Sequence, residues 1–200
     1  ALSLYQAGNF PHKTMEEILH QLRYRNGTID GYGSRLHYFS EWILENEKNG
    51  YIRNITTDLG QWKYKKNINF MSTHLSKYPG LADQKELQKV LHAQDRINAH
   101  DWVYIPKDKI RQVSHLIKDG DILAITTDIK DLDVVHTGFA LRSGDDIHLL
   151  HASESEGKVT ISKNTLADYL SRQKRQTGIM LLRPEYTFHI NKKSYKTAVD

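Results

Sequence analysis

Four strand-like segments follow one another in the C-terminal half of the chain, with no helical pattern between them. They read ILAITT, VVHTGFALR, IHLLHAS and KVTIS, and short polar segments separate them. β-branched and aliphatic residues dominate each segment, which favours strands. Strands joined by short connections pair antiparallel, because parallel pairing needs a long crossover. The sequence therefore predicts an antiparallel meander.

Helical patterns precede this meander. Thr14 and Glu17 have the spacing of a capping box just before an apolar stripe. Two further amphipathic patterns cover residues 35–48 and 83–98. Helices first and consecutive strands afterwards is the order of an α+β fold, not of alternating βαβ units. We expect an antiparallel sheet with helices packed on it.

Three further segments complete the expected architecture. Residues 51–66, YIRNITTDLGQWKYKK, alternate and carry β-branched and aromatic residues, which predicts a hairpin. Asn164 is the expected N-cap of a last helix, and residues 178–184 are the expected final strand. No repeat or low-complexity linker interrupts the chain, so we expect one domain over residues 1–184 and a basic tail over 185–200.

Composition excludes several classes of function. The net charge is only +4 over 200 residues, and no long basic block occurs, so we expect no nucleic-acid partner. No apolar run reaches the length of a membrane span. The absence of cysteine removes disulfides, cysteine-ligated zinc and any thiol nucleophile from these 200 residues. We expect no cofactor and leave the oligomeric state open.

Two histidines occupy the second and third segments of the meander. Side chains alternate between the faces of a strand, and a turn within residues 143–146 sets a register that places Gly138 opposite His151. In that register His136 lies opposite Ser153. Both imidazoles then project from one face as diagonal neighbours, ~7–8 Å apart at the backbone.

Such a pair has two interpretations. One imidazole can act as a base while the other orients it and fixes its tautomer. Alternatively, both are ordinary half-buried histidines with backbone partners. His148 falls on the opposite face, and a metal site would need His74 to converge on the pair, so we expect no metal.

The stretches LDVVHTGFALR, HLLHAS, KVTIS, LADYL and RQTGIMLLRP resemble the NlpC-type papain-like cell-wall hydrolases. The most similar branch is the bacterial N-acetylmuramoyl-L-alanine amidase-like family. IDGYGSRLHYFSEWI, INFMSTH and YIPK extend the resemblance upstream, so that it covers nearly the whole chain to Pro184. The resemblance implies a papain-like fold and a location outside the cytoplasm, in the periplasm or cell envelope.

The resemblance also implies a Cys–His mechanism. His136 matches the general base, and His151 matches the residue that orients it. The cysteine would lie just before Ala1, on a helix whose last turn is Ala1–Tyr5 and which stops at Gly8. Either that segment is trimmed from the sequence shown, which the helix-like start favours, or the protein has lost its nucleophile. In such proteins a helix N-terminus and a neighbouring imidazolium lower the pKa of the thiol.

Three softer positions complete the expected site. We expect Tyr38, Ser72 and His74 to line the substrate groove, because they lie in loops or at a helix start that match the family. Each has an alternative role, since Tyr38 could be plain packing and Ser72 could cap the next turn.

Three functions follow from these observations. The first is a cysteine-dependent amidase or endopeptidase acting on peptidoglycan or muropeptides. The second is a peptidoglycan- or peptide-binding module that keeps the groove without the chemistry. The third is a metal-dependent hydrolase, which a chelator would inhibit and a thiol reagent would not.

Overall fold

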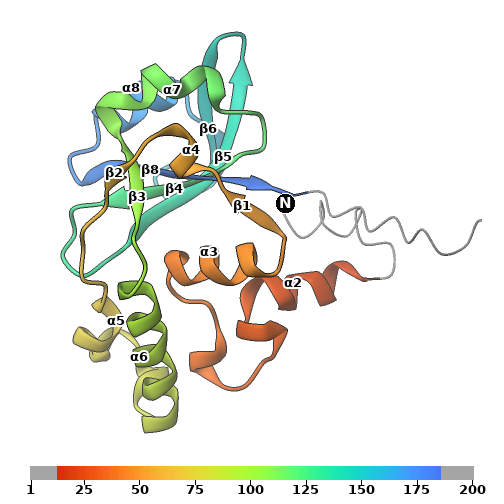
Figure 1. Cartoon of the computed structure of the whole chain (residues 1–200), viewed down its shortest axis with the longest axis vertical. Helices are drawn as coiled ribbons and strands as arrows, with labels where there is room; N and C mark the ends of the chain where they lie inside the picture. The colour runs from red at the N-terminus through yellow and green to blue at the C-terminus, as the bar shows by residue number, and fades with distance from the viewer. Residues whose placement is uncertain (1–12, 186–200) are drawn as a thin grey trace, which may run out of the picture.

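The computed structural model describes residues 13–185, and an antiparallel sheet forms its centre (Figure 1). Within these residues the strands are β1 (Ile52–Asn54), β2 (Trp62–Lys63), β3 (Val103–Pro106), β4 (Ile122–Thr127), β5 (Val134–Ser143), β6 (Asp146–Ser153), β7 (Lys158–Ile161) and β8 (Gln176–Pro184). Their spatial order is β2-β3-β8-β4-β5-β6-β7, and β1 pairs with β8 as well. The predicted meander β4-β5-β6-β7 is confirmed.

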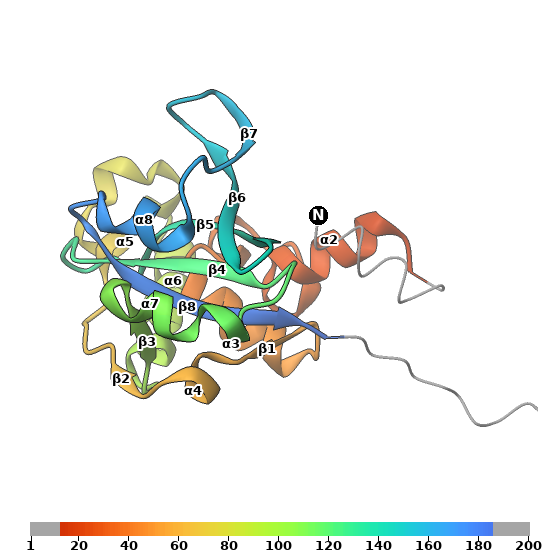
Figure 2. The same ribbon diagram turned by 90° about the horizontal axis from the view of Figure 1, so that it is seen from above.

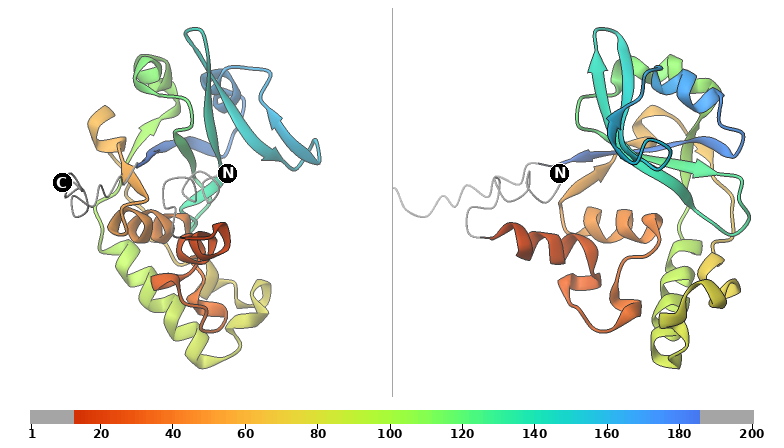
Figure 3. Two further views of the ribbon diagram at one scale, coloured as in Figure 1. Left: turned by 90° about the vertical axis from the view of Figure 1, so that its right-hand side faces the viewer. Right: turned by 180° about the vertical axis from the view of Figure 1, so that it is seen from behind.

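Helices cover both faces of the sheet (Figure 3). The α-helices within the described residues are α2 (Met15–Arg23), α3 (Phe39–Lys48), α4 (Thr56–Leu59), α5 (Phe70–Thr73), α6 (Gln84–Asn98), α7 (Ile110–Val113) and α8 (Leu166–Ser171). Short 3₁₀ turns link them at Arg25–Gly27, Tyr32–Ser34, Leu75–Lys77, Pro79–Leu81, Lys107–Lys109 and Ser114–Leu116. We call the layer of α2, α3, α5 and α6 the helical half; α4, α7 and α8 lie on the opposite face (Figure 1).

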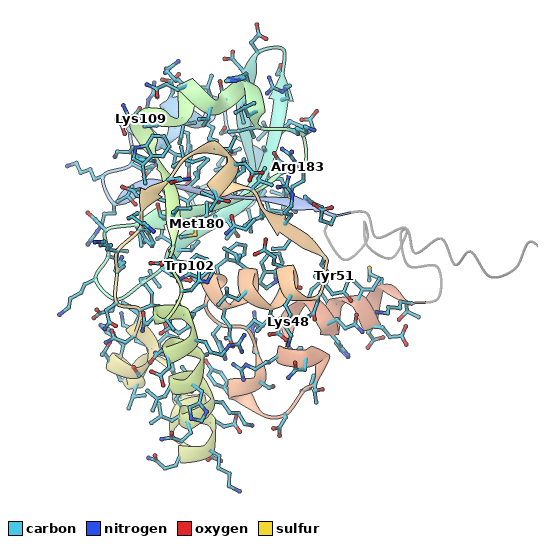
Figure 4. All side chains as sticks on the ribbon, viewed as in Figure 1. Lys48, Tyr51, Trp102, Lys109, Met180 and Arg183 are labelled. Carbon is cyan, nitrogen blue, oxygen red and sulfur yellow. The ribbon has the colours of Figure 1, made fainter. Side chains whose placement is uncertain are left out.

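Two apolar cores lie on the two faces of the central strands. Along β4, Ile122 and Ala124 face the helical half, whereas Leu123 and Ile125 face α7 and α8. This strict alternation follows from the period of two in a strand, and both faces are buried because both carry helices. Met180 of β8 is fully buried against the helical half (Figure 4).

Several local predictions are confirmed. Thr14 and Glu17 form both bonds of the capping box, with Thr14 Oγ1 accepting from the Glu17 backbone N–H at 3.1 Å. The helix predicted over 83–98 is α6, whose N-cap Asp83 accepts from the backbone N–H of Lys85 at 2.8 Å. These features depend only on residues within one turn, which is why the sequence predicts them well.

The hairpin predicted over residues 51–66 is wrong. The segment splits into β1, α4 and β2, and its two strands pair with different partners. β1 pairs with β8, so that Ile52 faces Pro184, and β2 pairs with β3, so that Trp62 faces Tyr104. Alternating sequence identifies strands, but it does not identify the partner of a strand.

Two helix starts also differ from expectation. The helix expected from residue 35 begins at Phe39, because Arg35 bridges to Tyr24 and Tyr38 keeps an extended backbone. The N-cap of α8 is Thr165 and not Asn164, since Thr165 Oγ1 accepts from the Asp168 backbone N–H at 3.3 Å.

Some predictions fall on residues outside the described range. One is the helical turn expected over Ala1–Tyr5. The other is the tail expected over 185–200, of which only the first residue lies within the described range. The domain boundary after Pro184 stays a prediction. Among residues 13–185, no helix combines the length and apolar character that crossing a bilayer requires.

Candidate active site

The β5–β6 hairpin brings the two histidines together. Its register pairs Phe139 with Leu150 and Ala140 with Leu149, which continues to Gly138 opposite His151. The turn-based register is therefore confirmed. His136 Nε2 lies 2.7 Å from His151 Nδ1, and the two rings meet edge to face with centroids 4.9 Å apart.

This contact constrains where the protons are. A bond between two imidazole nitrogens needs one N–H and one lone pair, so the pair shares a single proton along it. Nδ1 of His136 has no hydrogen-bond partner among the described residues. If His136 Nε2 donates, its Nδ1 is a free lone pair, which is the state that a general base needs.

Burial favours the neutral form of both histidines. Desolvation lowers the pKa of His136, and the neighbouring His151 lowers it further, because a second positive charge there would be repelled. Desolvation also lowers the pKa of His151, with Glu156 acting weakly in the opposite direction. A neutral imidazole at neutral pH can accept a proton.

The close packing of the two strands at Gly138 allows the rings of His136 and His151 to come into contact. A Cβ atom at this position would lie 2.7 Å from the carbonyl oxygen of Leu150 and 3.2 Å from Cβ of His151. Only glycine fits without moving β6. Ala140, which the sequence analysis grouped with Gly138 as a source of room, is instead packed into the core at 2% exposure.

Within residues 13–185, three cavities border the histidine pair. The first, about 450 Å³, is an apolar groove beside His151, lined among others by Phe39, Trp42 and Phe139. The second, about 330 Å³, is lined by His136, Tyr38 and Met71. The third, about 290 Å³, lies on the α8 side of His151. The pair therefore borders three openings of different chemistry.

Tyr38, the residue just before α3, lines the second cavity. Its hydroxyl accepts hydrogen bonds from the Met71 backbone N–H at 2.7 Å and from Gln94 Nε2 at 2.8 Å. Burial raises its pKa to about 12. The hydroxyl hydrogen has no acceptor among the described residues, so it can donate to a bound ligand. Of the three expected groove residues, Tyr38 is the one that shares a cavity with His136.

Ser72 and His74 lie outside the lining of that cavity. Ser72 Oγ donates to Gln94 Oε1 at 2.9 Å, so Ser72 supports the same amide that holds Tyr38. His74 Nδ1 lies 2.8 Å from the carbonyl oxygen of Phe70, and the two rings stack. The structure thus joins Ser72 to the site indirectly and leaves His74 apart, and their roles toward a substrate stay predictions.

Asp133 is a residue near the site that the sequence analysis did not single out. It is 2% exposed, and its Oδ2 accepts from the backbone N–H of Ser40 at 2.7 Å and from Ser40 Oγ at 2.8 Å. Ser40 lies in the first turn of α3, so Asp133, in the bend just before β5, caps that helix. Burial raises the pKa of Asp133, although these hydrogen bonds lower it.

The position of Asp133 matters because His136 follows three residues later on β5. Tyr64 also binds this segment, because its hydroxyl donates to the carbonyl oxygen of Asp133 at 2.8 Å. The start of β5 is therefore tied to α3 and to the segment after β2. In the sequence the only sign of this role is an aspartate directly before an apolar strand.

The described residues contain no group of three or more histidine, aspartate or glutamate side chains that could hold a metal ion. His136 and His151 bond to each other and do not converge with His74, which the metal interpretation required. Nothing in this geometry favours a metal centre.

Comparison with known proteins identifies the family. A family model described as "AmiA-like: N-acetylmuramoyl-L-alanine amidase-like" matches residues 1–179. The fold is thus that of an amidase-like α+β protein, and the chain belongs to the N-acetylmuramoyl-L-alanine amidase-like family. A search of curated proteins finds no match.

Solved structures agree with this assignment. An N-acetylmuramoyl-L-alanine amidase from Bacteroides uniformis is 34% identical with a TM-score of 0.86, over 92% of this chain and 79% of that chain. A Bacteroides fragilis protein described as a candidate xylanase is 38% identical with a TM-score of 0.79, over 84% and 74%. A Legionella pneumophila protein at 22% identity and a TM-score of 0.60, over 86% and 69%, shares the fold.

Proposed function

We propose that this chain is the base-bearing part of a cysteine-dependent hydrolase with an NlpC-type, papain-like site, which cleaves amide bonds in bacterial peptidoglycan. The observation that carries the proposal is the 2.7 Å contact between His136 Nε2 and His151 Nδ1. Membership of the amidase-like family and its similarity to a Bacteroides uniformis amidase support an amide substrate. The enzyme acts outside the cytoplasm in this proposal, in the periplasm or cell envelope.

The chemistry needs a thiol that these 200 residues do not contain. A cysteine encoded before Ala1 loses its proton to His136 Nδ1, and the thiolate attacks the carbonyl carbon of the amide. The tetrahedral intermediate collapses when the His136 imidazolium gives the proton to the departing amine. Water, activated by the neutral His136, then hydrolyses the thioester and releases the carboxylic acid.

The segment that bears the cysteine packs against the apolar groove beside His151 in this proposal. Phe39 and Trp42 stack there with centroids 4.8 Å apart, and both are only partly buried. Val159 on β7 lines the same groove and is 70% exposed. Covering these side chains would remove apolar surface from water and bring a helix to the edge of the histidine pair.

The second cavity is the proposed entrance for the scissile amide. Tyr38 lies at its wall with a free hydroxyl hydrogen, and His136 lines it as well. In this proposal Tyr38 donates to a substrate oxygen, while Ser72 holds Tyr38 in place through Gln94.

Glycoside hydrolysis, suggested by the name of the Bacteroides fragilis relative, needs two carboxyl groups that flank the bond. Asp133 is the carboxylate that lines the cavity shared by Tyr38 and His136, and it is fully engaged with Ser40. The geometry therefore favours amide over glycoside hydrolysis. A binding module without chemistry would keep the cavities but would not need a free nitrogen on His136.

The test uses the full-length protein, with the residues encoded before Ala1, on purified peptidoglycan and muropeptides. We expect release of peptide fragments that His136→Ala abolishes and that a thiol reagent, but not a chelator, blocks. His148→Ala is the matched control, because His148 lies on the same hairpin but bonds to the Ser162 carbonyl oxygen at 2.9 Å. Full activity in His136→Ala would refute the mechanism, and binding without turnover in the wild type would favour the module.

A further inference from the structure

The third cavity, on the α8 side of His151, is polar and about 290 Å³ in volume. It lies between the β6–β7 turn and the loop that leads into α8; Figure 2 shows α8 close to these strands. The proposed amide chemistry uses the opposite side of the pair, where the free nitrogen of His136 lies. This cavity therefore has no role in the mechanism above.

One ring nitrogen of His151, a residue that lines this cavity, has no hydrogen-bond partner among the described residues. His151 is 8% exposed, and its Nδ1 is taken by His136. Its Nε2 has no hydrogen bond to any described residue, and Tyr169 offers only a ring edge at 5.6 Å between centroids. This nitrogen can donate a hydrogen bond to an acceptor that enters the cavity.

The walls of the cavity indicate the charge of that acceptor. Lys163 and Arg172 line it, and neither forms an ion pair with a carboxylate among the described residues, although Arg172 attracts the carboxylate of Asp168 outside the lining. Glu156 is the one carboxylate in the lining, and its side chain contacts Lys158 at 3.9 Å. The cavity lining therefore contains two cationic side chains and one anionic side chain. Its net positive charge favours the binding of a negatively charged group.

We propose that this cavity is a binding site for a small oxyanion, a carboxylate or phosphate group, which accepts the Nε2 proton of His151 and pairs with Lys163 and Arg172. The Asn164 amide, which also lines the cavity, is a further donor to it. An acceptor at Nε2 selects the tautomer of His151 in which Nδ1 is a lone pair. His136 Nε2 must then donate, which frees Nδ1 of His136 to act as the base. This last step rests on the proposed function, whereas anion binding does not.

The binding test follows the ring nitrogens of His151 by NMR while acetate or inorganic phosphate replaces chloride at constant ionic strength. We expect a saturable shift of the His151 Nε2 signal and no saturable shift for His148. The double variant Lys163→Met/Arg172→Met should weaken binding roughly tenfold or more, because it removes both charged partners. Both side chains are exposed, and an unchanged His148 signal reports that the fold is intact.

The matched control is Lys48→Met/Lys85→Met, which removes the same charge from the exposed surface of the helical half; Figure 4 marks Lys48 there. This variant should bind acetate and phosphate as the wild type does. A shift that does not saturate, or that both double variants lose equally, would overturn the site and indicate general screening. Glu156→Gln should strengthen binding, and if it instead removes the response, Glu156 itself is the acceptor and the proposal fails.

A third comparison identifies the source of the anion. A wall stem peptide with free carboxylates is titrated beside the same peptide with every carboxylate amidated. Saturation by the free peptide alone, at lower concentration than acetate, assigns the site to a substrate carboxylate. Equal responses to the free peptide and acetate assign it to small ions from solution. These readouts need no turnover, so a failed hydrolase assay does not affect them.

Discussion

Gly138 lies directly opposite His151 on the β5–β6 hairpin. Because Gly138 has no side chain, β6 can pack close enough for the rings of His136 and His151 to meet. A methyl group there would lie 2.6 Å from Leu149 Cδ1 and 2.7 Å from the backbone oxygen of Leu150. The side chain of Leu149 can move, but the backbone of β6 cannot shift without carrying His151 with it. The 2.7 Å bond to His136 therefore depends on a residue that takes no part in it.

Gly138→Ala should lower the free energy of unfolding by about 1–3 kcal/mol through overpacking and should also separate the two imidazoles. Denaturant titration measures the first effect and fragment release from peptidoglycan measures the second. Ser143→Ala, at the exposed end of the same strand, serves as the control. Wild-type values for both quantities in Gly138→Ala would show that the hairpin has more room than the structure indicates.

His151→Ala should raise the pKa of His136 toward its ordinary value. The substitution admits water to the site and removes the imidazole whose protonation would repel a charge on His136, and these are the two causes that lower the pKa in the wild type. An NMR titration of the His136 ring measures the midpoint, with His148→Ala as the control. The same variant should lose most of its hydrolytic rate, because the base is no longer oriented. An unchanged midpoint would contradict the coupling between the rings.

Asp133→Ala should lower the free energy of unfolding by about 2–4 kcal/mol, since it leaves the buried donors of Ser40 without an acceptor. Denaturant titration measures the loss. Asp128→Ala is the matched control, because that carboxylate pairs with Arg175 at an exposed site and should cost less than about 1 kcal/mol. Similar losses in the two variants would remove Asp133 as the link between β5 and α3.

Tyr38→Phe should act on both stability and substrate binding. The lost hydroxyl leaves the Met71 N–H and Gln94 Nε2 without their acceptor, at a cost of about 1–3 kcal/mol. If the hydroxyl also donates to substrate, KM rises as well, which steady-state kinetics detects. Tyr32→Phe, at a residue 38% exposed, should change neither quantity. A stability loss with unchanged KM would restrict Tyr38 to a packing role.

The histidine pair should make the protein less stable in mild acid. Both pKa values lie below the ordinary 6.5, so the unfolded chain binds protons before the folded one does. Their contribution is fully present above pH 6.5 and is lost as the pH falls from there toward the folded-state values. His136→Gln/His151→Gln should therefore lose less stability than the wild type between about pH 7 and pH 5. Parallel losses in the two proteins would assign the acid sensitivity elsewhere, for example to His37.

Sequence reasoning succeeded where the deciding contacts are local. The capping box of α2, the N-cap of α6 and the register of the β5–β6 hairpin involve residues close in the chain. It failed where two candidates compete within a turn, as at Thr165 and Asn164. Tyr38, Ser72 and His74 were grouped from a resemblance, yet among them Tyr38 alone lines the cavity that His136 lines.

The sequence by itself determined which residues form the meander and that His136 and His151 project from one face, because strand alternation and a short turn settle both questions. Only the tertiary structure decided that β1 and β2 join separate partners, that Asp133 caps α3, and that three cavities border the imidazoles. These outcomes depend on contacts between residues far apart in the chain. Such contacts form only when the whole core is packed, and no local pattern encodes their partners.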